Sequence, residues 1–343
     1  MITDAAPEGI DADRVGTWLA MHVAGATPPF RYELITGGNS NLTYVVFDAA
    51  AHRFAFRRPP LGHLLATAHD VAREYRIVAA LASTSVPVPA ALAVCEDSSI
   101  NGAPFAVTGF VNGVVIDRPD KAAPLDASAR RDASFHLIDV LADLHAVDIE
   151  AVGLSTLSRH DGYLDRQLRR WSKQWAASRT RELPIIDDVE QRLQQRRPEQ
   201  RDVTIVHGDY RFGNCLVDMT KHRVAAVLDW ELCTLGDPLA DLGHLGIYWH
   251  DPARPLSLTN DPTPAGGFPT FAELLERYAI RTGRDVAQIE YYRAFAAWRL
   301  AIIGEGVAAR YLERHPDDAA ALRASQIVVE RLGAFALASL APA

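Results

Sequence analysis

The first third of the chain has the alternating pattern of β-strands. Between Phe30 and Val111, apolar residues occupy every second position in several short runs, which gives each run one apolar face. One segment instead carries Val71, Tyr75 and Val78 at helical spacing, which predicts a helix that packs on the strands. The predicted strands span residues 41–48, 53–57, 86–95 and 104–111, and the helix spans 67–81.

After about Ala127 the apolar positions recur at helical spacing for most of the remaining chain. Two short runs at 203–217 and 224–229 are strand-like exceptions. Gly, Asp and Pro cluster at 112–124, which predicts a boundary between a β-rich domain, 1–111, and a helical domain, 112–343. This is an α+β organisation. The predicted helices span residues 131–147, 163–179, 185–196, 238–248, 270–282, 286–312 and 317–340.

Composition and charge exclude several classes of protein. The 343 residues are 48% hydrophobic and 23% charged, as in ordinary globular proteins. The formal charge is −8 and no run of Lys or Arg is present, so a nucleic-acid partner is not expected. The three cysteines are too widely spaced for a disulfide framework or a cysteine-rich zinc site. The first residues lack a secretory signal pattern and the apolar tail 332–343 is too short to span a bilayer, so we expect a cytoplasmic protein without a membrane partner.

One polar segment contains the candidate catalytic and metal-binding residues. The string HGDYRFGN ends at Asn214, five positions after Asp209, and Asp229 follows twenty positions after Asp209 in VLDWE, at the end of an apolar strand. In phosphoryl transfer, one carboxylate accepts the proton of the attacking hydroxyl, while an amide oxygen and a second carboxylate hold Mg²⁺. A solvent-side turn capped by polar residues is the alternative for any one of these residues. The combination favours phosphoryl transfer.

These motifs resemble the aminoglycoside phosphotransferase and choline kinase family, whose fold is protein-kinase-like with two lobes. HGD stands where protein kinases have HRD, and Asp229 stands where they have the Asp of DFG. The resemblance runs from Leu34 to the last helices. It implies a nucleotide-binding lobe at 1–111, a lobe with the catalytic loop and acceptor pocket at 112–343, and ATP and Mg²⁺ as cofactors. By the same resemblance Asp209 is the catalytic base, and Asn214 and Asp229 are magnesium ligands.

The resemblance assigns further roles in the first lobe. Gly37, Gly38 and Ser40 lie between two predicted strands, where backbone N–H groups would meet nucleotide phosphates, although two glycines between strands also make ordinary hairpin turns. Ala55 would cover the adenine. Arg57 would meet the phosphates at a position where the family usually has Lys, and it is either a working substitute or the mark of a weakened enzyme.

Two more features of this lobe fit the same pattern. Glu74 borders the apolar face of its predicted helix, where a carboxylate needs a cation, and Arg57 is the expected partner. The alternative is a surface Glu that pairs with Arg73 or Arg76. The segment from Thr108 to Phe110 resembles the hinge whose backbone binds adenine.

The residues around the catalytic loop have less specific signals. Arg211 stands where protein kinases have a Lys that reaches the transferred phosphate, and a structural role is equally compatible with it. We expect His145 and His207 to pack and brace loops. Asp237 and Asp241 are expected to cap the helix that they open and to brace the catalytic loop.

Within the family, strings such as ITGGNSNLTY and AHDVAREYR are similar to a branch whose members are found fused or adjacent to acyl-CoA dehydrogenases. The resemblance implies a functional link to such enzymes. This chain itself has no G-x-G-x-x-G opening a βαβ unit, so flavin chemistry is not expected.

The distribution of charge bears on the acceptor. Residues 155–200 carry a net charge of +3 and residues 252–343 a net charge of 0, and these segments are expected to build the acceptor pocket. A pocket for polycationic aminoglycosides needs carboxylates. Arg299 and Arg310 share one face of the helix 286–312, which we expect to receive an anionic acceptor such as a hydroxyacyl or hydroxyacyl-CoA compound. Solvated side chains, or pairs with Glu305 or Glu313, are the alternative.

The sequence therefore predicts a kinase that phosphorylates a hydroxyl group of a small molecule. A nucleotide-binding pseudokinase or regulatory module is one alternative, and Arg57 is the feature in its favour. An aminoglycoside-modifying phosphotransferase is another. A zinc or serine hydrolase lacks the H-E-x-x-H or G-x-S-x-G spacing it would need.

Overall fold

The chain folds into two compact units in a computed structural model, which describes residues 7–35, 41–61, 70–256, 258–315 and 318–341. The first unit comprises Met1–Gly113 together with Ala225–Glu231, and the second comprises Val114–Val224 and Leu232–Ala343. The first boundary lies two residues from the predicted one. The return of 225–231 to the first unit was not predicted, because nothing in a short apolar strand indicates which core it joins.

An antiparallel five-stranded sheet forms the first unit, in the order β1-β2-β3-β5-β4. The alternation in the sequence produces one buried face, on which Tyr44, Val46, Phe54 and Phe56 are all at most 9% exposed. Phe56 stacks on Phe105 with ring centroids 4.6 Å apart. The strands are β1 (Arg31–Leu34), β2 (Leu42–Phe47), β3 (Arg53–Arg58), β4 (Ala91–Cys95) and β5 (Phe105–Gly109).

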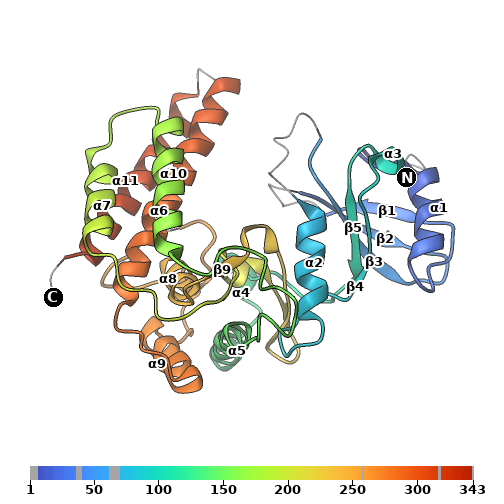
Figure 1. Ribbon diagram of the computed structural model, residues 1–343, viewed down its shortest axis with the longest axis horizontal. Coiled ribbons are helices and arrows are strands. Elements are labelled where there is room, and N and C mark those ends of the chain that lie inside the picture. The colour runs from blue at the N-terminus through green and yellow to red at the C-terminus, as the bar shows by residue number, and fades with distance from the viewer. Residues whose placement is uncertain (1–6, 36–40, 62–69, 257, 316–317, 342–343) are drawn as a thin grey trace. The chain divides into compact units, whose positions relative to one another are not determined.

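Helices cover both faces of this sheet (Figure 1). Helix α1 (Ala12–His22) packs Trp18 edge-on against Phe105, with centroids 4.8 Å apart; this helix was not predicted. Helix α2 (Val71–Leu81) contacts β4 and β5, and its N-cap Asp70 accepts a hydrogen bond from the N–H of Arg73 at 2.9 Å. The predicted start of α2 at Thr67 lies outside the described residues. A short helix, α3 (Ser98–Asn101), precedes β5.

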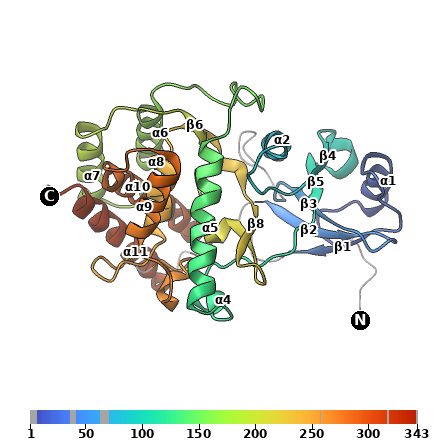
Figure 2. The same ribbon diagram turned by 90° about the horizontal axis from the view of Figure 1, so that it is seen from below.

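Helix α10 (Ile289–Arg314) is the centre of the second unit, where it contacts α6, α7, α8 and α11 (Figures 1 and 2). Its side chain Trp298 is fully buried and donates to the carbonyl of Ile186 at 3.2 Å. The other helices are α4 (Pro119–Ala122), α5 (Ala127–His145), α6 (Tyr163–Ser178), α7 (Pro184–Gln195), α8 (Leu239–Ile247), α9 (Phe271–Thr282) and α11 (Ala319–Ser339).

Two small sheets complete the structure. Strand β6 (Thr204–Val206) pairs antiparallel with β9 (Thr234–Gly236), and β7 (Cys215–Asp218) lies beside β8 (Arg223–Val227). These short strands bracket the HGDYRFGN loop. The predicted α+β class is confirmed, and the predicted helices agree with the observed ones within a few residues. None of the helices in the described ranges is both long and apolar enough to cross a membrane.

The packing of α8 on α10 depends on glycine. A Cβ atom placed on Gly243 would lie 2.5 Å from the carbonyl carbon of Tyr292, so the two helix backbones approach too closely for a side chain. We predict that Gly243→Ala lowers the free energy of unfolding by about 3 kcal/mol, because a backbone atom cannot move aside without displacing α10. Urea denaturation measures this change.

Gly304→Ala is the matched control, since a Cβ at that position in α10 would lie 3.4 Å from a methyl group of Val329, an ordinary contact. This variant should be neutral or gain about 0.5–1 kcal/mol from helix propensity. Equal stabilities of the two variants would show that α8 and α10 are not packed through Gly243.

Candidate active site

The backbone of the HGDYRFGN loop is held by a buried carboxylate. Asp241 on α8 is fully buried, and its two oxygens accept hydrogen bonds from the N–H groups of His207 at 2.7 Å and Gly208 at 2.8 Å. Gly208 has a φ of +85°, and a Cβ there would lie 2.8 Å from the carbonyl oxygen of Leu232. The loop therefore requires glycine at this position, both for its left-handed backbone and for space.

Asp241 is itself supported from two further helices. His145 on α5 contacts it through Nε2 at 3.3 Å, and the opposite ring nitrogen lies 2.7 Å from the hydroxyl of Tyr278 on α9. Burial raises the pKa of Asp241, but the interactions with His145 and the Gly208 N–H outweigh it, and the net pKa is lowered. Asp241 thus has the predicted bracing role, but the prediction that it caps α8 is wrong, because it lies within the helix and the N-cap is Pro238. Asp237 accepts from the Leu239 N–H at 3.0 Å and from the Tyr292 hydroxyl at 2.7 Å, so it also ties α8 to α10.

Asp209 is held from both sides of its carboxylate. The amide nitrogen of Asn214 donates to Oδ2 at 2.7 Å and to the main-chain carbonyl of Asp209 at 2.8 Å. Nε2 of His244, on α8, lies 2.5 Å from Oδ1, and Nε of Arg211 lies 3.3 Å from the same oxygen. The side chain of Asp209 remains 25% exposed, so it is not sealed off from solvent.

The surroundings of Asp209 keep it ionised. Burial raises its pKa, but the hydrogen bond from His244 and the positive charges of Arg211 and Arg299 hold the pKa well below the usual range of an aspartate. A carboxylate of this kind is a weak base at neutral pH. It can accept a hydrogen bond from a hydroxyl and orient it, and it takes the proton only when the hydroxyl has become strongly acidic during bond formation.

Arg211 lies where it was expected, whereas Arg299 does not. Arg211 lies beside Asp209 with its guanidinium 4.9 Å from the ring centre of Tyr248, which is compatible with either role considered for it. Arg299 is only 6% exposed, and its Nη2 donates to the carbonyl of Gly208 at 2.6 Å and contacts Nδ1 of His244 at 2.9 Å.

This placement argues against the expectation that Arg299 receives the acceptor, because its guanidinium is already engaged inside the protein. Its partners are also neither Glu305 nor Glu313. Arg310, three turns further along α10, is exposed.

His244 was not predicted as a site residue, although its ring nitrogen lies 2.5 Å from the Asp209 carboxylate. The available signal was its spacing, since His244 follows Asp241 at i+3 and the two share one side of α8. A histidine on an apolar helix ordinarily packs in a core. Spacing alone therefore does not distinguish a packing histidine from one that contacts Asp209.

The first unit contains a second charged cluster. Nε of Arg57 lies 3.1 Å from Oε2 of Glu74, and Nη2 donates to Oδ1 of Asp229 at 2.6 Å. Asn41 donates to the other oxygen of Glu74 at 2.9 Å. The expected pair of Glu74 with Arg57 is therefore present. Burial raises the pKa of Glu74 to about 7, and it outweighs the opposing effect of Arg57.

Asp229 has an unusual backbone. Its φ is +66°, which costs a non-glycine residue on the order of 1–3 kcal/mol. Its side chain accepts a hydrogen bond from Arg57, and the indole of the next residue, Trp230, donates to the carbonyl of Val227 at 3.2 Å. Strain of this kind is concentrated at functional sites.

The other predicted nucleotide-binding residues lie along the sheet. Ala55 and Arg57 are in β3, and Ala55 pairs with Thr108 of β5. Phe110 follows β5, and its N–H donates to the carbonyl of Arg53 at 3.3 Å. Gly37, Gly38 and Ser40 lie outside the described residues.

Asn214 and Asp229 offer the oxygen ligands that Mg²⁺ prefers. Across the described ranges, no group of three or more His, Cys, Asp or Glu side chains could hold a metal ion by itself.

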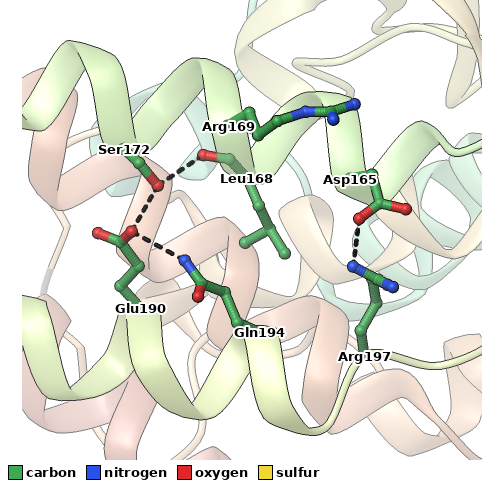
Figure 3. Close-up of a pocket in the computed structure, with 7 residues that line it drawn as sticks. All are labelled: Asp165, Leu168, Arg169, Ser172, Glu190, Gln194 and Arg197. Carbon is green, nitrogen blue, oxygen red and sulfur yellow. Dashed lines mark hydrogen bonds and ion pairs between the residues drawn. The ribbon is translucent and has the colours of Figure 1, made fainter.

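A separate polar cavity of about 410 Å³ lies between α6 and α7 (Figure 3). Several polar side chains of its lining bind one another: Arg197 pairs with Asp165, and Glu190 accepts from Ser172 at 2.6 Å and from Gln194 at 3.0 Å. It contains none of the predicted site residues.

Known proteins resemble this chain over most of its length. A model of the phosphotransferase enzyme family matches residues 31–298. Acyl-CoA dehydrogenase family member 10 of Mus musculus is 34% identical over 307 residues, which cover 88% of this chain and 28% of that protein. Member 11 of Rattus norvegicus is 33% identical over 313 residues, with 88% and 40% covered. The chain thus spans less than half the length of these relatives.

The chain also resembles solved structures of phosphotransferases. A putative aminoglycoside phosphotransferase from Ralstonia eutropha JMP134 has a TM-score of 0.79 and 32% identity, and the match covers 96% of this chain and 98% of that one. The ternary complex of aminoglycoside phosphotransferase APH(4)-Ia with AMP-PNP and hygromycin B has a TM-score of 0.62 and 15% identity, with 95% and 98% covered, which shows a likeness of fold alone. The predicted kinase-like architecture is confirmed.

The raised pKa of Glu74 predicts a pH-dependent stability. Because the folded pKa lies above the ordinary value of 4.5, the contribution of Glu74 is fully present below that value and is lost as pH rises through about 7. The difference in unfolding free energy between wild type and Glu74→Gln should therefore fall by about 3 kcal/mol between pH 4.5 and pH 8. Urea denaturation across this range measures it. A difference that does not change with pH would mean that Glu74 is ionised throughout.

Proposed function

The chain belongs to the phosphotransferase enzyme family, and on that premise we propose that it is an ATP- and magnesium-dependent kinase that transfers the γ-phosphate to a hydroxyl group of a small molecule. The observation that carries the proposal is the environment of Asp209. Its carboxylate is fixed by Asn214 at 2.7 Å and His244 at 2.5 Å, yet it stays partly exposed. A group held in this way can orient an attacking hydroxyl.

The chemistry of transfer fits a carboxylate of low basicity. In a loose transition state the acceptor hydroxyl keeps its proton until late, so a strong base is not needed early in the reaction. Asp209 then acts mainly by positioning the hydroxyl, and it receives the proton as the new P–O bond forms and the bond to ADP breaks. The charge of Arg211 beside it would stabilise the transferred phosphoryl group.

The nucleotide would be held by the first unit. Arg57 supplies the cation for the phosphates and Glu74 fixes it, while the backbone from Thr108 to Phe110 would bind the adenine near Ala55. Mg²⁺ would be held by Asn214 and Asp229, and when bound it neutralises charge on the phosphates. Gly37, Gly38 and Ser40 keep their proposed phosphate-binding role.

One observation favours a second candidate, a nucleotide-binding regulatory module. Arg57 contacts Asp229 at 2.6 Å and so occupies a carboxylate that a kinase needs for its metal. If this contact persists with nucleotide present, binding occurs without efficient transfer.

For the acceptor we propose a hydroxyacyl compound or its CoA thioester. The names of the relatives, acyl-CoA dehydrogenase family members 10 and 11, support a link to acyl-CoA chemistry. The net charges of +3 on 155–200 and 0 on 252–343 also disfavour a polycation. Arg310 remains the candidate contact on α10. An aminoglycoside acceptor is the alternative, as in the named structural neighbours.

The proposal predicts different effects for the two carboxylates. Asp209→Asn should lower the turnover number about 1000-fold and leave the affinity for ATP nearly unchanged, because this side chain faces the acceptor. Asp229→Ala should weaken Mg²⁺-ATP binding as well as the rate. Acceptor-dependent ADP release and isothermal titration with a non-hydrolysable ATP analogue measure the two quantities.

Asp188→Asn on α7 is the control, since it removes a carboxylate that pairs with its helix neighbour Arg192 at 3.0 Å. Wild-type turnover in Asp209→Asn would reject the proposed base. Absence of turnover in the wild type, with intact nucleotide binding, would favour the regulatory module.

The acceptor is tested by a direct comparison of substrates. We predict that kcat/KM for a hydroxyacyl-CoA exceeds that for kanamycin by at least about tenfold, and that Arg310→Ala raises KM for the CoA compound, because an exposed cation would be lost from its path. Efficient turnover of kanamycin with no effect of Arg310→Ala would establish the antibiotic-modifying alternative.

A further inference from the structure

His244 and Arg299 form a buried chain of hydrogen bonds that ends on Asp209. Both residues are at most 6% exposed. Nη2 of Arg299 lies 2.9 Å from Nδ1 of His244, and Nε2 of the same imidazole lies 2.5 Å from Oδ1 of Asp209. Nδ1 therefore faces a guanidinium, which can only donate hydrogen bonds, and Nε2 faces a carboxylate, which can only accept them.

We propose that Arg299 fixes His244 as the neutral imidazole with its hydrogen on Nε2, and that His244 in this form is a positioning residue for Asp209. The positioning role rests on the proposed function, because it matters only if Asp209 orients an acceptor. The tautomer and protonation of the imidazole can be measured in the resting protein, without any reaction.

The tautomer follows from the chemistry of the donors. A guanidinium has five N–H groups and no acceptor, so the nitrogen that faces it must offer a lone pair. Nδ1 is thus unprotonated, and the ring hydrogen of the neutral imidazole lies on Nε2, where it donates to Asp209. The two hydrogens of Nη2 are both used, because the same nitrogen donates to the carbonyl of Gly208 at 2.6 Å.

The charges around the imidazole support the neutral form. A proton on Nδ1 would face the fixed cation Arg299, and Arg211 is a second cation near the same site. Burial and Arg299 lower the pKa of His244, and Asp209 opposes them only in part. With His244 neutral, Arg299 and Asp209 balance each other in charge across the ring.

The consequence for Asp209 is mechanical. Asn214 holds Oδ2 from the catalytic loop, and His244 holds Oδ1 from α8, so the carboxylate cannot rotate. Arg299 also grips the Gly208 carbonyl, one residue before the base. Arg299 thus holds both the backbone of the loop and the imidazole of His244, which orients the proposed base.

The tautomer is tested by ¹⁵N NMR of the resting protein labelled at histidine. The chain has 12 histidines, and the resonances lost in His244→Gln identify the ring. We expect one protonated and one unprotonated ring nitrogen with the hydrogen on Nε2, and a mixture of tautomers in Arg299→Met. A doubly protonated ring, or a hydrogen on Nδ1, would overturn the proposal.

The positioning role is tested by two replacements of the ring. His244→Gln places an amide N–H near the position of Nε2, whereas His244→Phe keeps the ring and removes the donor. We expect kcat to fall about 100-fold in His244→Phe and less than about tenfold in His244→Gln, with KM for ATP changed less than about threefold in both. His22→Gln, an exposed histidine on α1, is the control.

A ring that serves only for packing would give the opposite order, with His244→Phe more active than His244→Gln, and this would overturn the positioning role. The two ideas fail separately. If the tautomer is as inferred and the wild type phosphorylates no acceptor, the proposed function fails alone. If the wild type turns over and His244 is doubly protonated, the tautomer proposal fails alone.

Discussion

The arrangement of the HGDYRFGN loop depends on one buried carboxylate, that of Asp241. A carboxylate without partners in the interior would cost several kcal/mol, so it must be satisfied there by donors. The N–H groups of His207 and Gly208 supply two of them, and His145 supplies a third contact. Because these donors come from the loop and from α5, the requirement to satisfy one charge on α8 brings three elements together at one point.

The position of Asp209 follows from this arrangement. The loop turns at Gly208, where a positive φ and the nearby Leu232 carbonyl exclude any other residue. Asp209 then faces the same helix that carries Asp241, one turn away at His244. Helix α8 therefore holds the loop through Asp241 and the Asp209 carboxylate through His244. Arg299 of α10 contacts both the loop, at the Gly208 carbonyl, and His244. This explains why a carboxylate with a lowered pKa can still serve as the proposed base, since its contribution is orientation more than basicity.

The sequence predicted most of the elements and much of the candidate site. The alternation in β2 and β3 and the helical spacing after 127 depend on local burial patterns, which the sequence records directly. The pair of Arg57 with Glu74 was predicted with the help of the family resemblance, since the need of the carboxylate for a cation also left Arg73 and Arg76 as partners. Helix α1 was missed, because its buried residues are few and follow an irregular acidic start.

The remaining contacts depend on tertiary geometry. The spacing of Arg299 and Arg310 placed them on one face of α10, but burial differs along that face, and Arg299 lies inside the protein. Likewise, the pattern around His244 does not reveal that the ring meets Asp209, 35 residues earlier in the chain.

The central claim is that this site transfers phosphate to a hydroxyl group, and ³¹P NMR tests it most directly. Wild-type protein with Mg²⁺-ATP and a hydroxyacyl-CoA should produce a new phosphomonoester resonance in equal amount to the ADP formed. The appearance of ADP with inorganic phosphate alone, or of no product with ATP bound, would contradict the claim.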